Sequence, residues 1–393
     1  MIDFNFQIRT KLYFGHNREK EIGEILNSYG AHNVLVVTGR SSAQKSGLLD
    51  QTIGLIKEAG IKCHVLSGVR ANPTTELVYE GIKICHSEKI DFLLAIGGGS
   101  AIDTAKAIAV GFYYDGDFFD FNCHLETPTK ALPVGSILTI SAAGSEMSTS
   151  CVIQDDSTGI KSGFNSELIR PVFAIENPEL TFTVNKEQTG NGIVDIMMHT
   201  LERYFQPSNE LELADELSIG LLKNVVKSGR IAIKNPCDHD ARANLMLASS
   251  LSHNGLTSIG KKFFMPVHQI EHALSGLYPE VAHGAGLSVL FPAWALYYCE
   301  YDIDKFDYLA RNLFGCNLKD RYQNGIKGIE CMKKYFHELG MPTSIHELPV
   351  SNIDIEKVVS KLTNDGTRVI GHHKKPMDKE VALEILKIAS RKD

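Results

Sequence analysis

The sequence lacks the features that would suit a polyanionic partner, a membrane or an extracellular location. Its 40 basic and 47 acidic side chains give a formal net charge of -7, so no overall attraction to nucleic acid is expected. No stretch approaches the roughly 18 apolar residues that span a bilayer, and the start, MIDFNFQIRTKLYFG, has no signal-peptide apolar block. We therefore expect a cytoplasmic protein without nucleic-acid or membrane partners.

Closely spaced cysteines are also absent. The eight cysteines are scattered and form no CxxC pair, so neither a disulfide framework nor a structural cysteine zinc site is expected. We interpret them as reduced thiols, of the kind that often serve as small buried hydrophobic side chains.

The order of the apolar segments divides the chain into two parts. A length of 393 residues is typical of two domains. Apolar runs alternate with amphipathic stretches through VLVVTGR, CHVLSGV and DFLLAIGGGS, and further apolar runs follow at 131–140 and 172–175, which is typical of a parallel sheet with crossover helices. From about Gly190 only helical periodicity is visible. We predict an α/β, Rossmann-like dinucleotide-binding domain over residues 1–186 and an all-α metal-binding domain over residues 187–393.

A glycine run marks a candidate phosphate site. Gly97, Gly98, Gly99 and Ser100 directly follow the apolar run DFLLAI and precede the helical stretch AIDTAKAIAV. Backbone N–H groups at such a turn, together with the positive end of a helix, suit a pyrophosphate. Asp103, in the first turn, either stabilises the helix start or orders the turn and binds nearby donors. The run is not GxGxxG, so it predicts a variant dinucleotide fold, and a plain strand-to-helix turn would also explain it.

A second polar turn has the sequence LTISAAGSEMS. It offers the hydroxyls of Thr139, Ser141 and Ser145 among small residues. Such a turn can line a nicotinamide or a phosphate, and a solvated loop is the equal alternative.

The first apolar strand ends in VVTGRSS, without the acidic residue that commonly binds the adenosine ribose in dinucleotide folds. Gly39 leaves room, and Arg40 and Ser41 supply positive charge and hydrogen-bond donors for a phosphate. This favours NADP(H) over NAD(H), although an ordinary surface arginine after a strand would also explain the sequence.

Histidines and one aspartate predict a metal site in the second half. The segment GNGIVDIMMHTLERY places Asp195 and His199 four residues apart on one helix face. VHQIEHALSG repeats this spacing with His268 and His272, and His283 follows in LYPEVAHGAGLSV. Polar pairs in apolar helices suggest ligands, and carboxylate with imidazole but no thiolate suits Fe(II) or Zn(II). Spacing alone leaves open which of His268 and His272 is a ligand.

These motifs together resemble the iron-containing alcohol dehydrogenase family, and most closely its butanol-dehydrogenase-like, NADPH-dependent aldehyde reductase branch. The resemblance extends through TKLYFGHN, GGGSAIDTAK, AAGSEMS, NPELTFT, TGNGIVDIMMHTLERY and HQIEHALSGLYPEVAHGAGLSVLFPAW. It implies the dehydroquinate synthase-like two-domain architecture and a homodimer. It also implies a metal in the interdomain cleft, held by Asp195, His199, His268 and His283.

The resemblance further implies cofactor contacts. The residues that would face the dinucleotide are Gly97, Gly98, Gly99, Ser100, Asp103, Thr139 and Ser141, with Lys161 at the ribose on the nicotinamide side and Leu180 and Thr183 around the cofactor. His272 becomes a catalytic candidate, as a proton relay beside the metal. Gly39 stands where NAD-using relatives carry Asp, which supports NADP(H).

The expected reaction is hydride transfer between NADP(H) and a small primary alcohol or aldehyde such as butanal. Relatives in this branch have a segment similar to DWATH at the position where this chain has FFMPVH, residues 263–268. This difference leaves the substrate preference open. Apolar residues near the predicted ligands favour an alkyl aldehyde over the phosphorylated substrate of a dehydroquinate synthase-type lyase: Met197, Met198, Phe263, Phe264, Met265 and Leu277. A zinc-dependent, NAD(H)-linked polyol dehydrogenase and a non-catalytic metal or nucleotide sensor also fit the two predicted sites. Trp294 is expected to lie in the core.

Overall fold

The computed structural model of the protein describes residues 3–206, 212–262, 264–371 and 374–391. It divides into a unit that spans Gln7–Thr183 and a second unit that comprises the chain from Val184 onward together with the residues up to Phe6. The boundary predicted after Lys186 lies at the first residue of helix α7 (Lys186–Tyr204), which Asn185 caps by accepting a hydrogen bond from the Gln188 N–H.

The first unit contains a six-stranded parallel sheet. Its strands are β1 (Lys11–Phe14), β2 (Asn33–Gly39), β3 (Lys62–Val69), β4 (Phe92–Gly97), β5 (Val134–Leu138) and β8 (Phe173–Glu176), in the order β1-β8-β5-β4-β2-β3. The central strand β4 is buried from Phe92 to Ile96, which explains its continuous apolar sequence. β3 and β4 lie on opposite sides of β2, so the strand order reverses there, and ligands of open parallel sheets bind at such a switch point.

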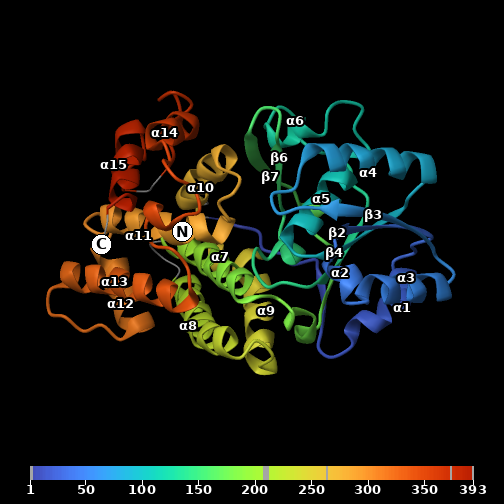
Figure 1. Ribbon diagram of the computed structural model, residues 1–393, viewed down its shortest axis with the longest axis horizontal. Coiled ribbons are helices and arrows are strands. Elements are labelled where there is room, and N and C mark those ends of the chain that lie inside the picture. The colour runs from blue at the N-terminus through green and yellow to red at the C-terminus, as the bar shows by residue number, and fades with distance from the viewer. Residues whose placement is uncertain (1–2, 207–211, 263, 372–373, 392–393) are drawn as a thin grey trace. The chain divides into compact units, whose positions relative to one another are not determined.

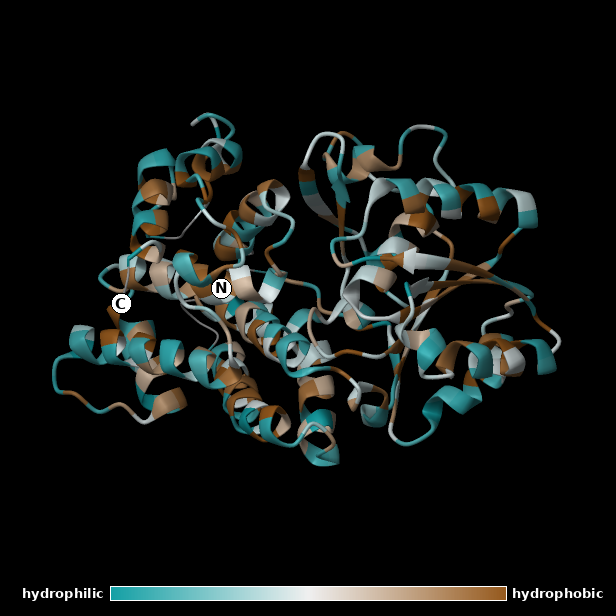
Figure 2. Ribbon diagram, in the orientation of Figure 1, coloured by the Kyte–Doolittle hydropathy of each residue, from teal (hydrophilic) through white to brown (hydrophobic). Residues whose placement is uncertain are grey.

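Helices cover both faces of this sheet. Figure 1 shows α4 (Thr75–Glu88) and α5 (Gly99–Gly111) on one side and α1 (Ile22–Ser28) and α3 (Leu48–Glu58) on the other. Alternate strand residues such as Val34 and Val36 pack with Ile22 and Ile56 from these helices. In Figure 2 the strands are mostly hydrophobic and the helices turn hydrophilic residues outward. The unit also contains the short helices α2 (Ser42–Lys45) and α6 (Phe119–Asn122) and an antiparallel hairpin of β6 (Ser150–Asp155) and β7 (Ile160–Asn165).

The second unit is helical. The described residues after α7 form α8 (Glu212–Lys234), α9 (His239–His253), α10 (Pro266–Leu277), α11 (His283–Tyr298), α12 (Ile303–Phe314), α13 (Arg321–Leu339), α14 (Ile355–Thr363) and α15 (Lys379–Ala389). α7 and α11 are buried along most of their length and contribute much of the hydrophobic core. Trp294 is 1% exposed in this core, as predicted. The predicted fold class, an α/β unit followed by a helical unit, is confirmed.

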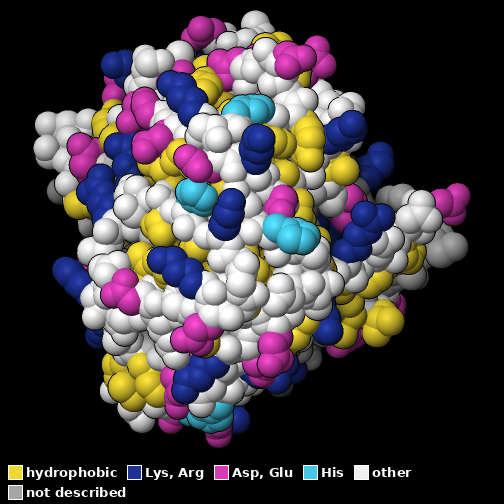
Figure 3. Space-filling view, turned by 90° about the vertical axis from the view of Figure 1, so that its right-hand side faces the viewer, with side chains coloured by type: hydrophobic (Ala, Val, Ile, Leu, Met, Phe, Trp, Pro, Cys, Tyr) yellow, Lys and Arg dark blue, Asp and Glu magenta, His cyan; other side chains and the backbone are white. Residues whose placement is uncertain are grey.

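Among the residues described, no helix combines the length and the apolar character needed to cross a membrane. On the face drawn in Figure 3, acidic and basic side chains are interspersed rather than separated by sign.

Candidate functional site

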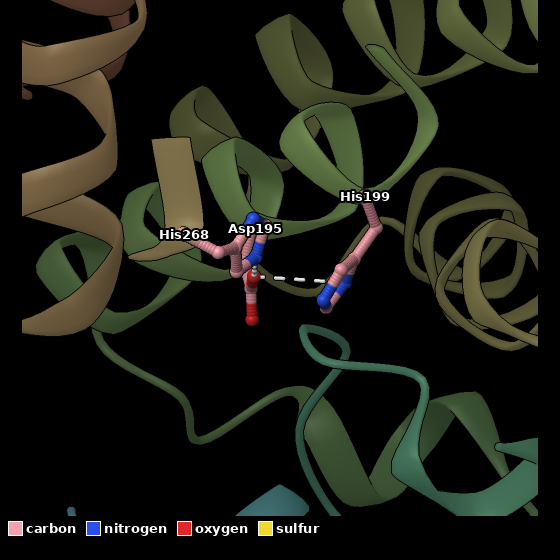
Figure 4. Close-up of side chains that lie close together, drawn as sticks. All are labelled: Asp195, His199 and His268. Atoms are coloured by element: carbon pink, nitrogen blue, oxygen red, sulfur yellow. Dashed lines mark ion pairs between the residues drawn. The ribbon is translucent and has the colours of Figure 1, made fainter. Parts of the chain in front are cut away.

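The four predicted metal ligands meet around one carboxylate oxygen. Asp195 Oδ1 lies 3.6 Å from His199 Nδ1, 3.6 Å from His268 Nε2 and 3.7 Å from His283 Nε2. The aspartate and His199 lie one turn apart in α7, whereas the other two histidines come from the start of α10 and the start of α11. Figure 4 shows three of these side chains, from α7 and α10, pointing toward one another.

The donor atoms fit a divalent ion. Asp195 Oδ1, His199 Nδ1 and His268 Nε2 are buried and have no hydrogen-bond partner among the described residues. Burial of such groups without compensation is costly. Ligand atoms that each lie about 2.1 Å from a tetrahedral ion are about 3.4 Å apart, close to the three distances measured from Asp195 Oδ1. The ligand atoms of Asp195, His199 and His268 also lie within 4.8 Å of one another, whereas His283 groups with Glu271 and His272. A cation at this point would satisfy all of these atoms.

Two buried glutamates hold two of the histidine rings. Glu202 Oε2 is hydrogen-bonded to His268 Nδ1, and Glu271 Oε2 to His283 Nδ1. The glutamates are 1% and 0% exposed. Glu202 also accepts the Val267 N–H at 2.7 Å, so it fixes the start of α10. With Nδ1 engaged, each ring turns Nε2 toward Asp195, the arrangement by which outer carboxylates orient metal-binding histidines.

Neither glutamate was among the residues predicted from the sequence. The available signal is their spacing, because Glu202 lies three residues after His199 and Glu271 three residues after His268. A residue three positions along a helix shares its face, so a carboxylate at that offset within an apolar helix is expected to face the same site, although the histidine that each glutamate bonds lies on another helix.

Burial and neighbouring charges set the protonation of the histidines. Burial lowers the pKa of His199 well below its usual range, and His253, whose ring centroid lies 4.1 Å away, adds to the effect. At His268 burial also lowers the pKa, but Glu202 and Asp195 together outweigh it and raise the pKa to about 9. Metal ligation requires a neutral imidazole, so an ion would displace a proton from His268.

His272 lies one turn beyond His268 in α10. Its ring centroid is 6.4 Å from that of His268 and 5.7 Å from that of His283. Glu271, His272 and His283 bring nitrogen and oxygen atoms within 4.8 Å of one another. The predicted catalytic histidine is therefore half-buried beside the ligand cluster.

The apolar residues predicted near the ligands have different environments. Met197 and Met198 are 0% exposed and belong to the core of the helical unit. Leu277 is half-buried at the end of α10. Phe264 lines a small cavity with Glu202 and Trp294, and Phe263 lies outside the described residues.

The glycine turn lies at the carboxyl end of β4. A Cβ atom on Gly98 would lie 2.3 Å from Ile140 Cγ2, and one on Gly99 would lie 3.1 Å from Ala143 Cβ. The glycines therefore allow the segment after β5 to pack directly against the turn. α5 begins at Gly99 without a side-chain cap, so its N-terminus offers backbone donors and a positive dipole end to an anion.

The second predicted turn joins the first. The Thr139 N–H donates to the Gly97 carbonyl oxygen at 3.0 Å. Ser141 Oγ is buried and, within the described part of the chain, has no hydrogen-bond partner, which leaves it suited to a ligand. Ser100 is the second residue of α5, and its carbonyl oxygen accepts from Thr104 Oγ1 at 2.8 Å.

Asp103 makes contacts within the protein. Its carboxylate accepts from Ser145 Oγ at 2.6 Å and from the Val152 N–H at 3.0 Å. These bonds tie α5 to the 3-10 helix η2 (Ser145–Met147) and to β6. A contact between Asp103 and the cofactor stays a prediction.

The remaining predicted cofactor residues all lie in the first unit. Gly39 ends β2, the neighbour of β4, and Arg40 and Ser41 follow it on the surface. Lys161 is half-buried in β7. Leu180 lies in the 3-10 helix η4 (Pro178–Thr181) against the core, and Thr183 is exposed.

Comparison with known proteins shows the family to which the chain belongs. The family model for iron-containing alcohol dehydrogenase matches residues 9–178, and the C-terminal model of the Fe-containing alcohol dehydrogenase family matches residues 189–390. The chain is 40% identical over 389 residues to NADH-dependent butanol dehydrogenase A of Clostridium acetobutylicum, which covers 98% of this chain and 99% of the relative. It is 29% identical over 379 residues to the NADPH-dependent aldehyde reductase YqhD of Escherichia coli, with 95% and 96% covered.

A solved structure shows the same fold over the whole length. The crystal structure of NADH-dependent butanol dehydrogenase A from Thermotoga maritima superimposes with a TM-score of 0.95 at 35% identity and covers 100% of this chain and 99% of that one. The resemblance predicted from the motifs is thus confirmed. The chain belongs to the iron-containing alcohol dehydrogenase family and is an oxidoreductase of the alcohol dehydrogenase and aldehyde reductase type.

Proposed function

We propose that the protein transfers hydride between a nicotinamide dinucleotide and a small primary alcohol or aldehyde, with Fe(II) held by Asp195, His199, His268 and His283. The observation that carries the proposal is that one carboxylate oxygen, Asp195 Oδ1, lies within 3.7 Å of a nitrogen atom of each of the three histidines. Asp195 Oδ1, His199 Nδ1 and His268 Nε2 are buried and have no hydrogen-bond partner among the described residues. When bound, such an ion supplies Lewis-acid polarisation of a carbonyl oxygen, and a nicotinamide supplies the hydride. Zn(II) suits the same donor set and is the second candidate ion.

The protein's own groups have separate tasks in this scheme. Glu202 and Glu271 keep Nδ1 of two ligand rings engaged, which leaves Nε2 of each ring for the ion. We assign to His272 the donation of a proton from an imidazole nitrogen to the carbonyl oxygen of the substrate during reduction, which forms the hydroxyl of the product alcohol. A His272→Asn variant should then keep its metal but lose about 100-fold or more in kcat.

The proposed cofactor form is NADP(H). Gly39, Arg40 and Ser41 at the end of β2 present no carboxylate to repel a 2′-phosphate, and Arg40 is exposed. NAD(H) is the second candidate, because the Clostridium relative is named as NADH-dependent whereas the less similar Escherichia relative is named as NADPH-dependent.

Gly39→Asp tests this choice. A Cβ atom at position 39 would meet its nearest neighbour, the Val69 carbonyl oxygen, at 3.7 Å, so a side chain fits. A carboxylate there should lower kcat/KM for NADPH relative to NADH by about tenfold or more, through repulsion of the 2′-phosphate. An unchanged ratio would contradict the assignment.

The reaction itself is tested with butanal. Protein loaded anaerobically with Fe(II), or separately with Zn(II), is mixed with butanal while the absorbance of NADPH and of NADH is followed in parallel. We expect NADPH to be lost faster, and we expect a chelator to stop the loss. Faster loss of NADH would overturn the cofactor preference alone, whereas no loss of either cofactor with either metal would overturn the proposed reaction.

We also propose that the protein is a cytoplasmic homodimer, because the family resemblance implies paired subunits. Light scattering on the purified protein should then give twice the chain mass of 43.4 kDa. A single-chain mass at every concentration tested would contradict this part.

A further inference from the structure

His253, the last residue of α9, packs on the ring of a predicted metal ligand. Its ring centroid lies 4.1 Å from that of His199, with 37° between the two ring planes. His268 packs on the same ring, with 4.6 Å between the centroids and 14° between the planes. The His199 ring, which α7 carries, therefore contacts one ring from α9 and one from α10.

The ring of His199 lacks the support that the other two ligand rings have. A buried glutamate engages Nδ1 of His268 and another engages Nδ1 of His283, and outer carboxylates of this kind fix the orientation of a metal-binding imidazole. Within the described part of the chain, the only carboxylate paired with His199 is that of Asp195, which is itself a predicted ligand. The orientation of the His199 ring therefore depends on the rings that pack against it.

The end of α9 is held by buried contacts. Ser249, Ser250 and Ser252 are 0% exposed, so this part of the helix packs closely within the helical unit. Asn254 is 1% exposed, and its carboxamide oxygen accepts the Leu256 N–H at 2.9 Å, which orders the turn after the helix. His253 itself is half-buried. Its ring therefore extends from a well-packed helix end rather than from a solvated loop.

His253 lies beside the ligand cluster without belonging to it. Among the residues described, donor atoms within 4.8 Å of one another form two groups, Asp195 with His199 and His268, and Glu271 with His272 and His283. His253 is in neither group, so its contribution comes from the ring contact rather than from ligation. The packing of two aromatic rings corresponds to roughly two- to tenfold in an equilibrium constant. A contact of this size is large enough to change a measured metal affinity.

We propose that His253 is a positioning residue for the metal site, whose ring packs on His199 and holds that ligand in the orientation that faces the ion. The proposal rests on the metal site proposed above. His253 acts through His199 and is not itself a ligand. The three ligand imidazoles are then oriented in two ways, two of them by a buried carboxylate and the third by a packed ring.

The test compares His253→Ala and His253→Phe with a control, His239→Ala. Phenylalanine keeps a flat ring at position 253 but lacks the ring nitrogens, whereas alanine removes the ring altogether. His239 is the first residue of the same helix, so its replacement makes the same change about 20 Å away. For each variant we would measure the thermal midpoint of the metal-free protein, the Fe(II) and Zn(II) dissociation constants by competition with a chelator, and the visible absorption spectrum of the Co(II)-loaded protein.

We expect His253→Ala to raise the metal Kd by about threefold or more and to change the Co(II) spectrum, because the His199 ring loses its support. His253→Phe and His239→Ala should keep the wild-type Kd and the wild-type spectrum. If His253→Ala does not fold, His253→Leu, which keeps bulk without a flat ring, replaces it with the same expectation.

Three results would decide against parts of this account. A wild-type Kd and spectrum in the folded His253→Ala or His253→Leu protein would overturn the inference alone. An equal loss of affinity in His253→Phe would also overturn it, because the ring nitrogens rather than the ring face would then matter. Wild-type protein that binds none of the three ions would overturn the proposed metal site as well.

Discussion

Replacement of Glu202 by glutamine should weaken the metal site without unfolding the helical unit. Glutamine has the same shape, but it removes the negative charge that faces His268 Nδ1 and the backbone N–H groups of Val267 and His268. A hydrogen bond to a charged group contributes about 1.5–3 kcal/mol to stability. Loss of one such bond corresponds to about a 10- to 100-fold rise in the metal Kd, the range typical of outer-shell substitutions.

The assay is competition between the protein and a chelator of known affinity for Fe(II) or Zn(II), with NADPH binding measured on the same samples. Glu187→Gln is the matched control, because Glu187 is exposed in the first turn of the same helix. The metal Kd should rise for Glu202→Gln and stay unchanged for Glu187→Gln. The dinucleotide affinity should stay unchanged in both variants. A metal Kd within about threefold of the wild-type value would refute the role assigned to Glu202.

Three further predictions concern pH, the glycine turn and the core. The pKa of His268 is raised to about 9 in the metal-free protein, so below that pH an ion must displace its proton. Calorimetry at pH 7 in buffers of different ionisation enthalpy should therefore show proton release on metal binding, and the metal affinity should rise toward pH 9. Metal binding without proton release would contradict the placement of His268 between Glu202 and Asp195. Gly98→Ala places a Cβ atom 2.3 Å from Ile140 Cγ2 and should raise the cofactor KM while metal content measured by atomic absorption stays the same; an unchanged cofactor KM would argue against a phosphate site at the turn. Trp294→Ala should lower the free energy of unfolding by about 3–5 kcal/mol in chemical denaturation, because the ring is 1% exposed in the helical core, and a loss below about 1 kcal/mol would contradict its place there.

Local geometry explains which parts of the site the sequence could predict. A spacing of four residues places Asp195 and His199 on one face of any helix, so this pair is readable without the fold. Likewise, an apolar strand followed by glycines and a helix predicts the Gly97–Ser100 turn from neighbouring residues alone. The convergence of Asp195 with His268 and His283 depends on how α10 and α11 pack against α7, which spacing cannot give.

The residues that sequence reasoning missed are those whose role depends on distant segments. Glu202 has the appearance of an ordinary helix carboxylate, and its function depends on α10 placing His268 beside it. His253 ends a helix far along the chain from His199, and the role proposed for it depends on the packing that brings the two rings together. The hairpin of β6 and β7 was missed as well, because polar residues interrupt both strands and only their pairing with each other defines them.

X-ray absorption spectroscopy of the Fe(II)-loaded protein identifies the atoms that bind the ion. We predict one ion per chain, bound by three imidazole nitrogens and one carboxylate oxygen at about 2.0–2.2 Å, with no sulfur, and loss of this spectrum in His268→Ala. A sulfur ligand, fewer imidazoles, or an unchanged spectrum in His268→Ala would contradict the assignment of Asp195, His199, His268 and His283 as the metal site.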